Sequence, residues 1–486
     1  MIYENLLTLT ARAPITSGLR EGETFTPYAA LVERIGRLAA DFIDRGIESG
    51  DPVALLIPNS SDLFVTAHAL FAIGAIAMPM GVTATRSELA TLARKTGLAA
   101  VIATPGRAAA AEMLIADTAP GMPLLLTDAL PEGTANAQLP KLPGDTTALY
   151  LFSSGSTGSP KVVPHTHAEL IADAERAGTA WDLQPDDIVL DILPGNFAMG
   201  FMLGATQAVA RGATTLYWSD PLPLALSRKK LLDTMVGERV TFMGAVPAMY
   251  GTIAGQTGSF ALRLRLAFSG GAGLTRPIFE AVRERLDITL RQAYGSTEAI
   301  MVSHNNSADP VATWASVGKP AGDARVRIAA CDTDLGPSVG ELEVRSSSLM
   351  RGYLGDAVAN AQAFDDGWFR TGDLASLDEE GRIFIRGRSK LLIEVSGFKI
   401  DPIEVEETLM TLPAVAEAAV VGFPDTRSGN RLIAFVVRGA HVSADELIRT
   451  ARERLSAQKV PDEIVFTDAL PRSPTGKLLR GRLREL

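Results

Sequence analysis

The amino-acid sequence predicts an α/β protein with a large N-terminal domain of parallel sheets layered with helices, a small antiparallel β subdomain and a smaller C-terminal α/β domain on a hinge. In the first half of the chain, helical stretches alternate with short apolar strands. This alternation is typical of parallel sheets that are covered by helices on both faces. From residue 324 onward the pattern changes to short β segments, at residues 324–330, 340–346 and 381–387, which predict the antiparallel subdomain.

The helices and strands of the N-terminal half are predicted by turn residues and apolar runs. Thr26 and Pro27 form a predicted N-cap and a proline at the first helical position, and Gly46 is placed to end that helix. The apolar run at residues 52–57 then predicts a buried strand. The same alternation predicts later helices at residues 89–96, at 168–177 and after Phe201, and later strands at residues 99–103, 187–193 and 213–218.

One stretch is apolar enough to be mistaken for a membrane span. Residues 63–85 carry no formal charge apart from the titratable His68. Gly74, Pro79 and Gly81 interrupt this stretch, whereas a spanning helix needs about 20 consecutive apolar residues. We therefore expect a buried helix followed by a buried strand, and no membrane span.

A further α/β unit is expected after Arg388. Asp401, Pro402 and Glu404 resemble an N-cap, a first-turn proline and a capping-box acid. Apolar strands follow at residues 414–422 and 431–439, and Ser443 with Glu446 predicts a second amphipathic helix that runs to about Gln458. The expected organisation is an N-terminal domain over residues 1–387, a hinge at 388–391 and a C-terminal domain over 392–486.

Composition limits the classes of function that the chain can have. Its 46 Lys and Arg residues are outnumbered by 56 Asp and Glu residues in a chain of 486, so the net charge is −10, with no basic run. Such a chain is a poor candidate for binding nucleic acid or an anionic membrane surface. Cys331 is the single cysteine, which excludes an internal disulfide and a cysteine-based metal cluster. Residues 1–14 lack the features of a signal peptide, so the cytoplasm is the expected compartment.

A polar loop rich in glycine and serine follows the apolar run at residues 148–152. Glycine allows backbone N–H groups to approach a phosphate, hydroxyl groups donate hydrogen bonds to it, and a lysine supplies a positive charge. The spacing is not that of a Walker A loop, and composition alone leaves an ordinary polar turn as an equal alternative. The candidate phosphate-binding residues are Ser153, Ser154, Gly155, Ser156, Thr157, Gly158 and Lys161.

Four further motifs follow this loop along the chain, at residues 292–298 (QAYGSTE), 367–373 (GWFRTGD), 387–399 and 471–477 (PRSPTGK). Together the five motifs resemble, in the same order, those of the adenylate-forming enzymes. This superfamily includes acyl- and aryl-CoA ligases, firefly luciferase and the adenylation domains of peptide synthetases, and the resemblance covers nearly the whole chain. Ten residues of the chain are lysines, and four of these lie within the motifs, as expected where chemistry requires an ammonium group: Lys161, Lys390, Lys399 and Lys477.

The resemblance implies a first reaction in which a carboxylate attacks the α-phosphorus of ATP and pyrophosphate leaves. Both reactants are anionic, so catalysis depends on positioning and on cationic stabilisation. By resemblance, the loop from Ser153 to Lys161 holds the β- and γ-phosphates and Thr297 contacts the α-phosphate. Glu298 binds Mg²⁺, whose preferred ligands are oxygen atoms. Lys477 reaches the α-phosphate and the carboxylate during this step.

The remaining nucleotide contacts are also implied by the resemblance. Adenine lies between the Tyr294 ring and the backbone of a glycine-rich segment. Asp373 accepts hydrogen bonds from both ribose hydroxyls, and Arg388 donates one there. The other residues assigned to the nucleotide in this way are Gly270, Gly271, Ala272, Gln292 and Gly295.

The second reaction implied is thioester formation, in which a thiol attacks the acyl-adenylate and AMP leaves. In the family the C-terminal domain, which carries the lysine loop, swings between the two steps. Lys390 occupies the hinge position, Gly397 lies where the pantetheine arm passes, and Phe398 and Lys399 line that face. The thiol is expected to be that of coenzyme A, with the phosphopantetheine of an acyl carrier protein as the alternative. Four basic residues expected on the last long helix either bind such an acceptor or form a solvated face: Arg449, Arg452, Arg454 and Lys459.

The residues that match the family's acid pocket carry no charge: Phe197, Ala198, Met199, Gly200, Met243, Ala245, Ala272, Ile300 and Met301. Burying an ammonium group without a partner is costly. Domains that activate amino acids have an aspartate at the position that matches Ala198, and hydroxybenzoate-activating relatives usually have an asparagine there. Amino acids and salicylate-like acids are therefore disfavoured.

The segment from Phe197 to Gly200 departs from the common family pattern. Many ligases have a histidine at the position of Phe197, whereas benzoate-CoA ligases have a similar Phe-Ala-Tyr-Gly sequence. We therefore expect an apolar, aromatic carboxylic acid as substrate. A medium-chain fatty acid is the alternative, because methionine side chains also accept an alkyl chain. The intact motifs at Lys477, Glu298 and the phosphate loop argue against a non-catalytic nucleotide-binding scaffold.

Overall fold

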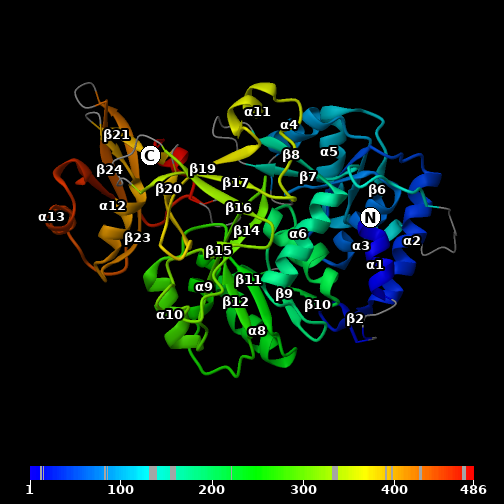
Figure 1. The fold of residues 1–486 in the computed structure, drawn as a ribbon, viewed down its shortest axis with the longest axis horizontal. Coiled ribbons are helices and arrows are strands. Elements are labelled where there is room, and N and C mark those ends of the chain that lie inside the picture. The colour runs from blue at the N-terminus through cyan, green and yellow to red at the C-terminus, as the bar shows by residue number, and fades with distance from the viewer. Residues whose placement is uncertain are drawn as a thin grey trace. The chain divides into compact units, whose positions relative to one another are not determined.

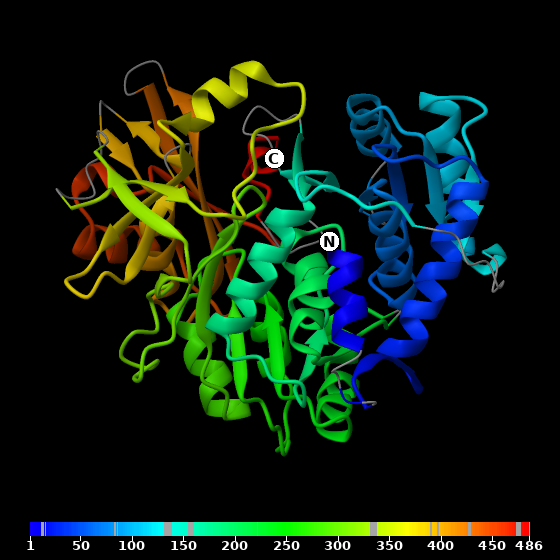
Figure 2. The same cartoon turned by 45° about the vertical axis from the view of Figure 1, so that its right-hand side comes forward.

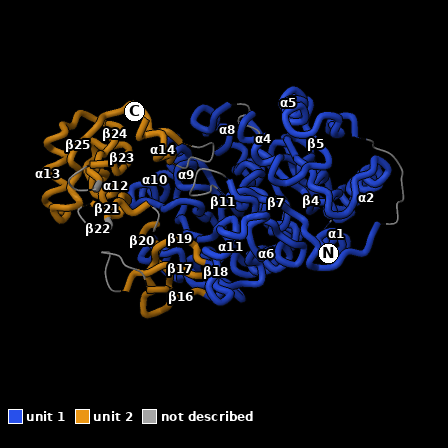
Figure 3. The backbone as a smooth tube through the Cα atoms, turned by 90° about the horizontal axis from the view of Figure 1, so that it is seen from above, with its two compact units in different colours: residues 1–325, 344–369 blue, residues 326–343, 370–486 orange. Residues whose placement is uncertain are grey.

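The structure is a computed structural model and describes residues 1–10, 14, 16–81, 84, 86–130, 139–153, 160–220, 222–330, 338–388, 391–395, 398–425, 429–472 and 478–485. The chain forms two compact units, residues 1–325 with 344–369 and residues 326–343 with 370–486 (Figure 3). The hinge predicted at residues 388–391 lies within the second unit. Ser389 and Lys390 lie outside the described residues, so this domain boundary stays a prediction.

The first unit contains a six-stranded sheet in the order β6 (Leu124–Leu126), β5 (Ala100–Ala103), β3 (Pro52–Leu56), β4 (Ile76–Pro79), β7 (Thr147–Ser153) and β8 (Lys161–Thr166). Neighbouring strands are parallel from β6 to β7, and the pair β7 and β8 is antiparallel. The central strands are apolar and buried along almost their whole length, as expected for a parallel sheet covered on both faces.

A nine-stranded sheet completes the core of this unit, in the order β15 (Lys319–Pro320), β14 (Ile300–His304), β13 (Arg291–Ser296), β12 (Leu266–Ser269), β11 (Phe242–Ala245), β9 (Ile188–Asp191), β10 (Thr214–Tyr217), β1 (Gly18–Glu21) and β2 (Thr24–Pro27). The strands are parallel from β13 to β1, and the outermost pairs are antiparallel. The predicted α/β class with parallel sheets is therefore confirmed.

Helices pack against both sheets (Figures 1 and 2). They are α1 (Ile2–Thr10), α2 (Tyr28–Asp44), α3 (Ser61–Ile73), α4 (Arg86–Thr96), α5 (Ala108–Thr118), α6 (His167–Ala180), α7 (Ala198–Met202), α8 (Leu224–Gly237), α9 (Pro247–Ala254), α10 (Arg276–Leu286) and α11 (Ala357–Ala363). The predicted start of α2 is wrong. Thr26 is paired with Leu19 in a β-hairpin, so its backbone belongs to β2, and Pro27 is the N-cap.

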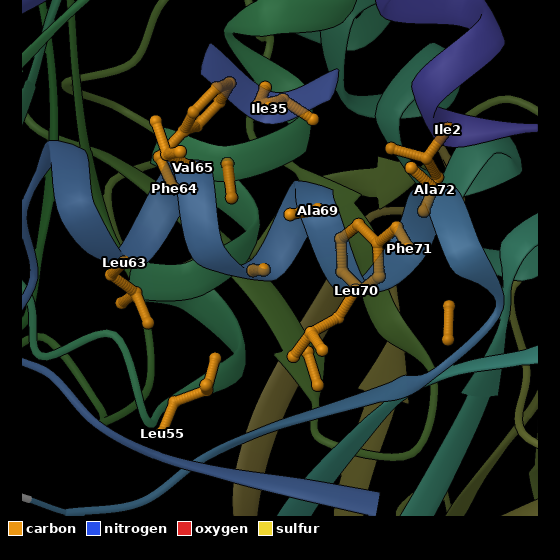
Figure 4. Packing of buried hydrophobic residues seen from close by; sticks show 14 of the residues in the cluster. Ile2, Ile35, Leu55, Leu63, Phe64, Val65, Ala69, Leu70, Phe71 and Ala72 are labelled. Carbon is orange, nitrogen blue, oxygen red and sulfur yellow. The ribbon is translucent and has the colours of Figure 1, made fainter. Parts of the chain in front are cut away.

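The uncharged stretch that starts at Leu63 is the buried helix α3 followed by β4, as predicted. All eleven residues from Leu63 to Ile73 are buried. Figure 4 shows α3 side chains packed with Ile35 of α2 and Ile2 of α1 on one side and with Leu55 of β3 on the other. A helix that is covered all round has no face for a charged residue. Among the described residues, no helix has both the length and the apolar character that crossing a membrane requires.

A five-stranded sheet has the order β16 (Arg325–Ala329), β17 (Gly340–Arg345), β19 (Trp368–Leu377) and β18 (Phe364–Asp365), with β20 (Ile383–Arg388) also paired to β19. Both β18 and β20 run antiparallel to β19, which confirms the predicted antiparallel subdomain. The division between the two units falls within β16, β17 and β19.

The C-terminal residues form β21 (Ile393–Val395), β22 (Phe398–Ile400), α12 (Pro402–Met410), β23 (Val415–Asp425), β24 (Gly429–Arg438), α13 (Ala444–Arg454), β25 (Glu463–Phe466) and α14 (Arg480–Leu483). The predicted caps are present: Asp401 accepts a hydrogen bond from Ile403 N, and Ser443 accepts one from Glu446 N. Two apolar clusters form the core of this segment, and all their described members lie between Ile393 and Leu483.

One basic residue of this segment differs from its predicted position. Lys459 lies in a short 3-10 turn after the end of α13, and its Nζ donates to both carboxylate oxygens of Glu404, at 2.7 and 2.8 Å. Glu404 therefore pairs with a lysine, and the predicted capping box is wrong: the described contacts at the start of α12 include the Asp401 cap but no bond from Glu404 back to Asp401 N. Arg449, Arg452 and Arg454 are exposed on α13 as expected.

A buried carboxyl group lies at the end of β9. The Oδ1 atom of Asp191 accepts a hydrogen bond from Leu193 N at 3.3 Å, whereas Oδ2 has no hydrogen-bond partner among the described residues. Burial raises the pKa of Asp191 to about 7, against the opposing effect of hydrogen bonds from Asn59 and Leu193. Between this value and the pKa of an unfolded aspartate, about 3.9, the folded state keeps a proton that the unfolded state has lost.

Replacing Asp191 by asparagine is therefore expected to alter how stability depends on pH. In the wild type, the stabilising effect of the bound proton is lost as the pH rises from about 4 to about 7. Asparagine does not titrate, so the Tm of the variant relative to the wild type should rise over this range and stay level above it. Thermal unfolding of both proteins at several pH values measures this difference. A difference in Tm that does not vary with pH would contradict the burial of an ionisable carboxyl group.

Candidate functional site

Four neighbouring strands of the nine-stranded sheet end at the same edge. β13, β12, β11 and β9 are consecutive and parallel, so the segments that follow them lie side by side. Gly270, Gly271 and Ala272 follow β12, and the segment 194–200 follows β9. The predicted adenine segment and part of the predicted acid pocket, separated by about 70 residues in the sequence, are thereby brought to one edge.

Glycines allow these two segments to lie in contact. A Cβ atom at Gly270 would lie 3.2 Å from Met199 Sδ and 3.3 Å from Ala293 O, so a side chain at this position would displace the methionine. Gly271 has a φ of +75°, a conformation that favours glycine. The predicted pocket residue Met199 therefore lies directly against the glycine-rich backbone.

The hairpin of β13 and β14 carries the predicted nucleotide motif. Its register shifts between Tyr294 and Gly295, and a Cβ atom at Gly295 would lie 2.0 Å from Ile300 O, so this position requires glycine. Ile300 has a φ of +53°. This left-handed conformation is a genuine outlier for a β-branched residue and costs on the order of 1–3 kcal/mol. The turn between the two strands is therefore strained.

Thr297 and Glu298 lie in this strained turn. The Thr297 carbonyl accepts a hydrogen bond from His165 Nε2 at 2.8 Å, and the Glu298 carbonyl accepts one from Met350 N at 2.8 Å. The Oε1 atom of Glu298 accepts a hydrogen bond from the Tyr353 hydroxyl at 3.0 Å. These contacts hold the backbone and one carboxylate oxygen of the predicted magnesium ligand.

Tyr353 also contacts Lys161, which is predicted to bind phosphate. The Nζ atom of Lys161 lies 4.2 Å from the centroid of the Tyr353 ring, within the range of a cation–π interaction. Lys161, Tyr353 and Glu298 thus form one continuous set of contacts. Sequence reasoning missed Tyr353, and the residues around it, Arg351, Gly352 and Leu354, give no signal of this role.

The predicted phosphate loop connects β7 and β8. Ser153 and Lys161 are partners in the register of this hairpin. The residues between them that were assigned to phosphate lie outside the described residues: Ser154, Gly155, Ser156, Thr157 and Gly158. Their assignment stays a prediction.

Gln292 uses its side chain within the protein. Its Nε2 donates to Trp314 O at 2.8 Å, and its Oε1 accepts from Leu274 N at 3.4 Å. Because Leu274 follows the glycine-rich segment directly, these bonds anchor the end of that segment. The direct contact of Gln292 with the nucleotide stays a prediction.

The predicted acid-pocket residues pack in three different clusters. Met301 and Phe268 belong to one apolar cluster, against which Met199 packs, and Ile300 belongs to another, against which Ala198 packs. Met243 and Ala245 are buried among α8, α9 and α10, while Gly244 between them faces Phe268 and Leu203. The structure thus groups Met199 with Met301 and Ala198 with Ile300, but it does not group Met243 and Ala245 with either pair. Phe197 is the N-cap of α7, and Gly200 is packed so tightly that a Cβ atom would lie 2.5 Å from Pro194 O.

Two predicted ribose-binding residues meet in the second unit. Asp373 in β19 and Arg388 in β20 are paired in register, and Arg388 Nε donates to Asp373 Oδ1 at 2.7 Å. The carboxylate of Asp373 is largely buried, with a side-chain exposure of 13%. A carboxylate held by an arginine is well placed to accept hydrogen bonds in a fixed orientation.

Several predicted residues fall where the structure gives no description. Lys477, Lys390 and Gly397 lie outside the described residues, as do the side chains of Phe398 and Lys399. Arg472 and Leu478, which flank the predicted lysine loop, form an antiparallel β-bridge. The roles assigned to these residues stay predictions.

Two buried charged residues beside the site were also missed. Asp173 and Arg176 of α6 are 0% and 4% exposed, although their spacing in the sequence is typical of a solvated helix face. Both contact the backbone of Met301. Burial raises the pKa of Asp173, against the opposing effect of bonds from Met301 N and Gln207 and of the charge of Arg176.

Comparison with known proteins agrees with this geometry. The family model described as "AMP-binding enzyme" matches residues 10–354, and the model "AMP-binding enzyme C-terminal domain" matches residues 404–477. A feruloyl-CoA synthase of Amycolatopsis sp is 32% identical over 485 residues, which cover 97% of this chain and 96% of that protein. An indoleacetate–CoA ligase of Aromatoleum aromaticum is 30% identical over 493 residues, which cover 97% and 95%.

Solved structures of similar proteins share the whole architecture. ATP-bound MatB from Rhodopseudomonas palustris has a TM-score of 0.89 at 26% identity, with 100% of this chain and 99% of that chain covered. The o-succinylbenzoate-CoA synthetase MenE from Bacillus subtilis, in complex with its acyl-adenylate, has a TM-score of 0.89 at 26% identity, with 99% and 98% covered. The motifs, the strand-edge geometry and the matches over nearly the full length all agree, and the resemblance seen in the sequence is confirmed: the chain belongs to the AMP-binding, adenylate-forming enzyme family.

Proposed function

We propose that this protein is an AMP-forming acid–thiol ligase, which activates an apolar, aromatic carboxylic acid with ATP and transfers the acyl group to coenzyme A. The observation that carries this proposal is the contact of Met199 with Gly270 at the carboxyl edge of the nine-stranded sheet. It joins an uncharged pocket segment to the glycine-rich segment assigned to adenine. The relatives named above, which include a feruloyl-CoA synthase and an indoleacetate–CoA ligase, support an aromatic acid.

In the first step, a carboxylate oxygen attacks the α-phosphorus, and the bond from this phosphorus to the bridging oxygen of pyrophosphate breaks. Lys161 and the loop before it bind the β- and γ-phosphates, and the role proposed for Lys477 is to neutralise the negative charge of the two reactants. In the second step, the sulfur of the thiol attacks the acyl carbonyl, the thiol proton is released and AMP leaves. Positioning and charge neutralisation carry most of the rate enhancement in such reactions.

The residues around Glu298 fit a magnesium ion. Among the described residues, no group of three or more metal-ligating side chains occurs. Mg²⁺ in nucleotide enzymes usually takes only one or two carboxylates and completes its coordination with water and phosphate oxygens. Because Tyr353 binds Oε1 of Glu298, the carboxylate is oriented, and among the described residues no hydrogen bond to Oε2 competes with the ion. When bound, Mg²⁺ neutralises charge on the phosphates.

The proposed class of acid, an apolar one, follows from the absence of charge among the predicted pocket residues. Ala198 packs against the apolar cluster that contains Ile300, and Met199 packs against the one that contains Met301, so these two groups of residues offer only apolar contacts. A medium-chain fatty acid is the second candidate. It is supported by the similarity of the chain to a long-chain fatty acid–CoA ligase of Mycobacterium tuberculosis, which is 29% identical. A carrier-protein phosphopantetheine is the alternative acceptor. We propose the cytoplasm as the location, because ATP and coenzyme A are both available there.

An exchange assay with matched acids tests this function. Acid-dependent exchange of labelled pyrophosphate into ATP is expected to be fast with 3-phenylpropanoate and about 100-fold slower with phenylalanine, which has the same skeleton plus an ammonium group. Octanoate in the same assay tests the fatty-acid alternative, and detection of acyl-CoA or of acylated carrier protein identifies the acceptor. Equal rates with phenylalanine and phenylpropanoate would contradict the uncharged pocket, and no exchange with any acid would contradict the proposed reaction.

A further inference from the structure

The strained turn before β14 is held by two charged residues of α6. The backbone N–H of Met301 donates to Asp173 Oδ1 at 3.0 Å, and Arg176 Nη1 donates to the Met301 carbonyl at 2.9 Å. One residue is therefore bound through both of its backbone polar groups. Met301 directly follows Ile300, whose φ is +53°.

Arg176 is also linked, through Ser348, to Ala299, the residue before Ile300. Arg176 Nη1 also donates to Ser348 Oγ at 2.7 Å, and Ser348 Oγ donates to the Ala299 carbonyl at 2.9 Å. The residues before and after Ile300 are thus both bound to one network. An isoleucine does not adopt the left-handed conformation unless its surroundings impose it.

The two charged residues are fixed in turn by other groups. Gln207 Nε2 donates to Asp173 Oδ2 at 2.7 Å, and Arg176 Nε donates to Asp323 Oδ1 at 2.9 Å. Asp173 is fully buried and Arg176 nearly so. A buried ion pair is poor evidence of a contribution to stability, because the cost of removing the charges from water offsets their attraction. Holding a strained backbone is a better explanation for this arrangement.

We propose that Asp173 and Arg176 are positioning residues that keep Ile300 in its left-handed conformation. By doing so they fix Glu298, which precedes the strained residue, relative to Met301 of the predicted acid pocket, which follows it. The inference rests on the proposed function, since it takes Glu298 as the magnesium ligand. Through the strained turn, Asp173 and Arg176 connect the nucleotide-binding part of the site with the acid-binding part.

Asp173→Leu tests the proposal by removing the acceptor of the Met301 N–H. We expect the Mg²⁺ concentration for half-maximal pyrophosphate exchange to rise about tenfold and kcat to fall about tenfold, because the turn that carries Glu298 relaxes. Asp173→Asn should stay within about threefold of the wild type. Its Oδ1 still accepts from Met301 N, and Gln207 can rotate its amide to accept from the new Nδ2.

Asp187→Leu is the matched control for loss of stability. Asp187 is also a buried aspartate, 4% exposed, but it pairs with Arg265 at 2.6 Å and with Thr241, not with the turn. The Asp187→Leu variant should lower Tm to a degree similar to that of Asp173→Leu and leave the Mg²⁺ requirement unchanged. An equal rise in the Mg²⁺ requirement in both leucine variants would overturn the proposal.

A second-site change isolates the strain itself. Glycine adopts the left-handed conformation without strain, so Ile300→Gly is expected to return the Mg²⁺ requirement of Asp173→Leu to within about threefold of the wild type. No recovery in the double variant would overturn the proposed role of the strain.

Hydrogen exchange at the Met301 amide gives a readout that does not require activity. This amide should be protected in the wild type and in Asp187→Leu and should exchange about tenfold faster in Asp173→Leu. If the wild type catalysed no exchange with any acid, the proposed function would fail, while this measurement would still decide whether Asp173 holds the turn. Unchanged protection in Asp173→Leu would overturn the inference.

Discussion

Glu298→Gln is expected to lower the rate of adenylate formation about 100-fold and to raise the Mg²⁺ requirement, because a neutral amide is a weaker ligand for a hard cation. The Tyr353 hydroxyl can still donate to the amide oxygen, so the fold around residue 298 should be retained. Pyrophosphate exchange measured over a range of Mg²⁺ concentrations gives both effects, and thermal unfolding checks that the variant is folded.

Tyr353→Phe serves as the matched comparison. It removes the hydroxyl that orients Glu298 but keeps the ring on which Lys161 lies. We expect a loss of only about three- to tenfold in this variant, since the carboxylate is still present. If Glu298→Gln kept more than about a tenth of the activity, the assignment of Glu298 as the magnesium ligand would be wrong.

Lys477→Ala is expected to have the largest effect on adenylation, a loss of about 1000-fold, because the lysine neutralises charge on two anions as they approach. Thioester formation from an acyl-adenylate supplied ready-made should remain within a few-fold of the wild type, since the family resemblance implies that the lysine loop leaves the site before that step. Separate assays of the two half-reactions measure this split. Stability should change little, because a lysine in a polar loop contributes little to the folded state.

Gly397→Leu is expected to affect the two half-reactions in the opposite way. A side chain at this position is expected to obstruct the pantetheine arm and to slow the thiol step more than adenylation. Together the two variants make a test that general damage to the C-terminal domain cannot mimic. Equal slowing of both steps in either variant would argue against the assigned role of that residue.

Much of the fold could be predicted from local patterns. The uncharged stretch at α3 and β4, the caps at Asp401 and Ser443 and the change to β segments after residue 324 all appear in the structure. The start of α2 could not be predicted in this way. Thr26 has the features of a helix cap, but its backbone pairs with Leu19, and this pairing determines its conformation.

The candidate site shows the same limit. Motif residues such as Tyr294, Glu298 and Asp373 could be named from the sequence because short patterns surround them. Tyr353, Asp173 and Arg176 could not, because their partners are 55, 128 and 125 residues away, and two of the three bind backbone atoms that any residue would offer. On a helix, an aspartate and an arginine three residues apart predict a solvated face, and only the tertiary structure shows them buried.

The apolar clusters of the C-terminal segment have a practical consequence. Because their described members all come from residues 393–483, this segment contains its own hydrophobic interior. The compact unit that holds this segment also includes residues 326–343 and the chain from residue 370, and Gly387 lies against Asp401, so the piece that can be grafted from one enzyme to another is this whole unit. Evolution and protein engineers can therefore exchange the part that carries the lysine loop while they leave the acid-recognition elements as they are.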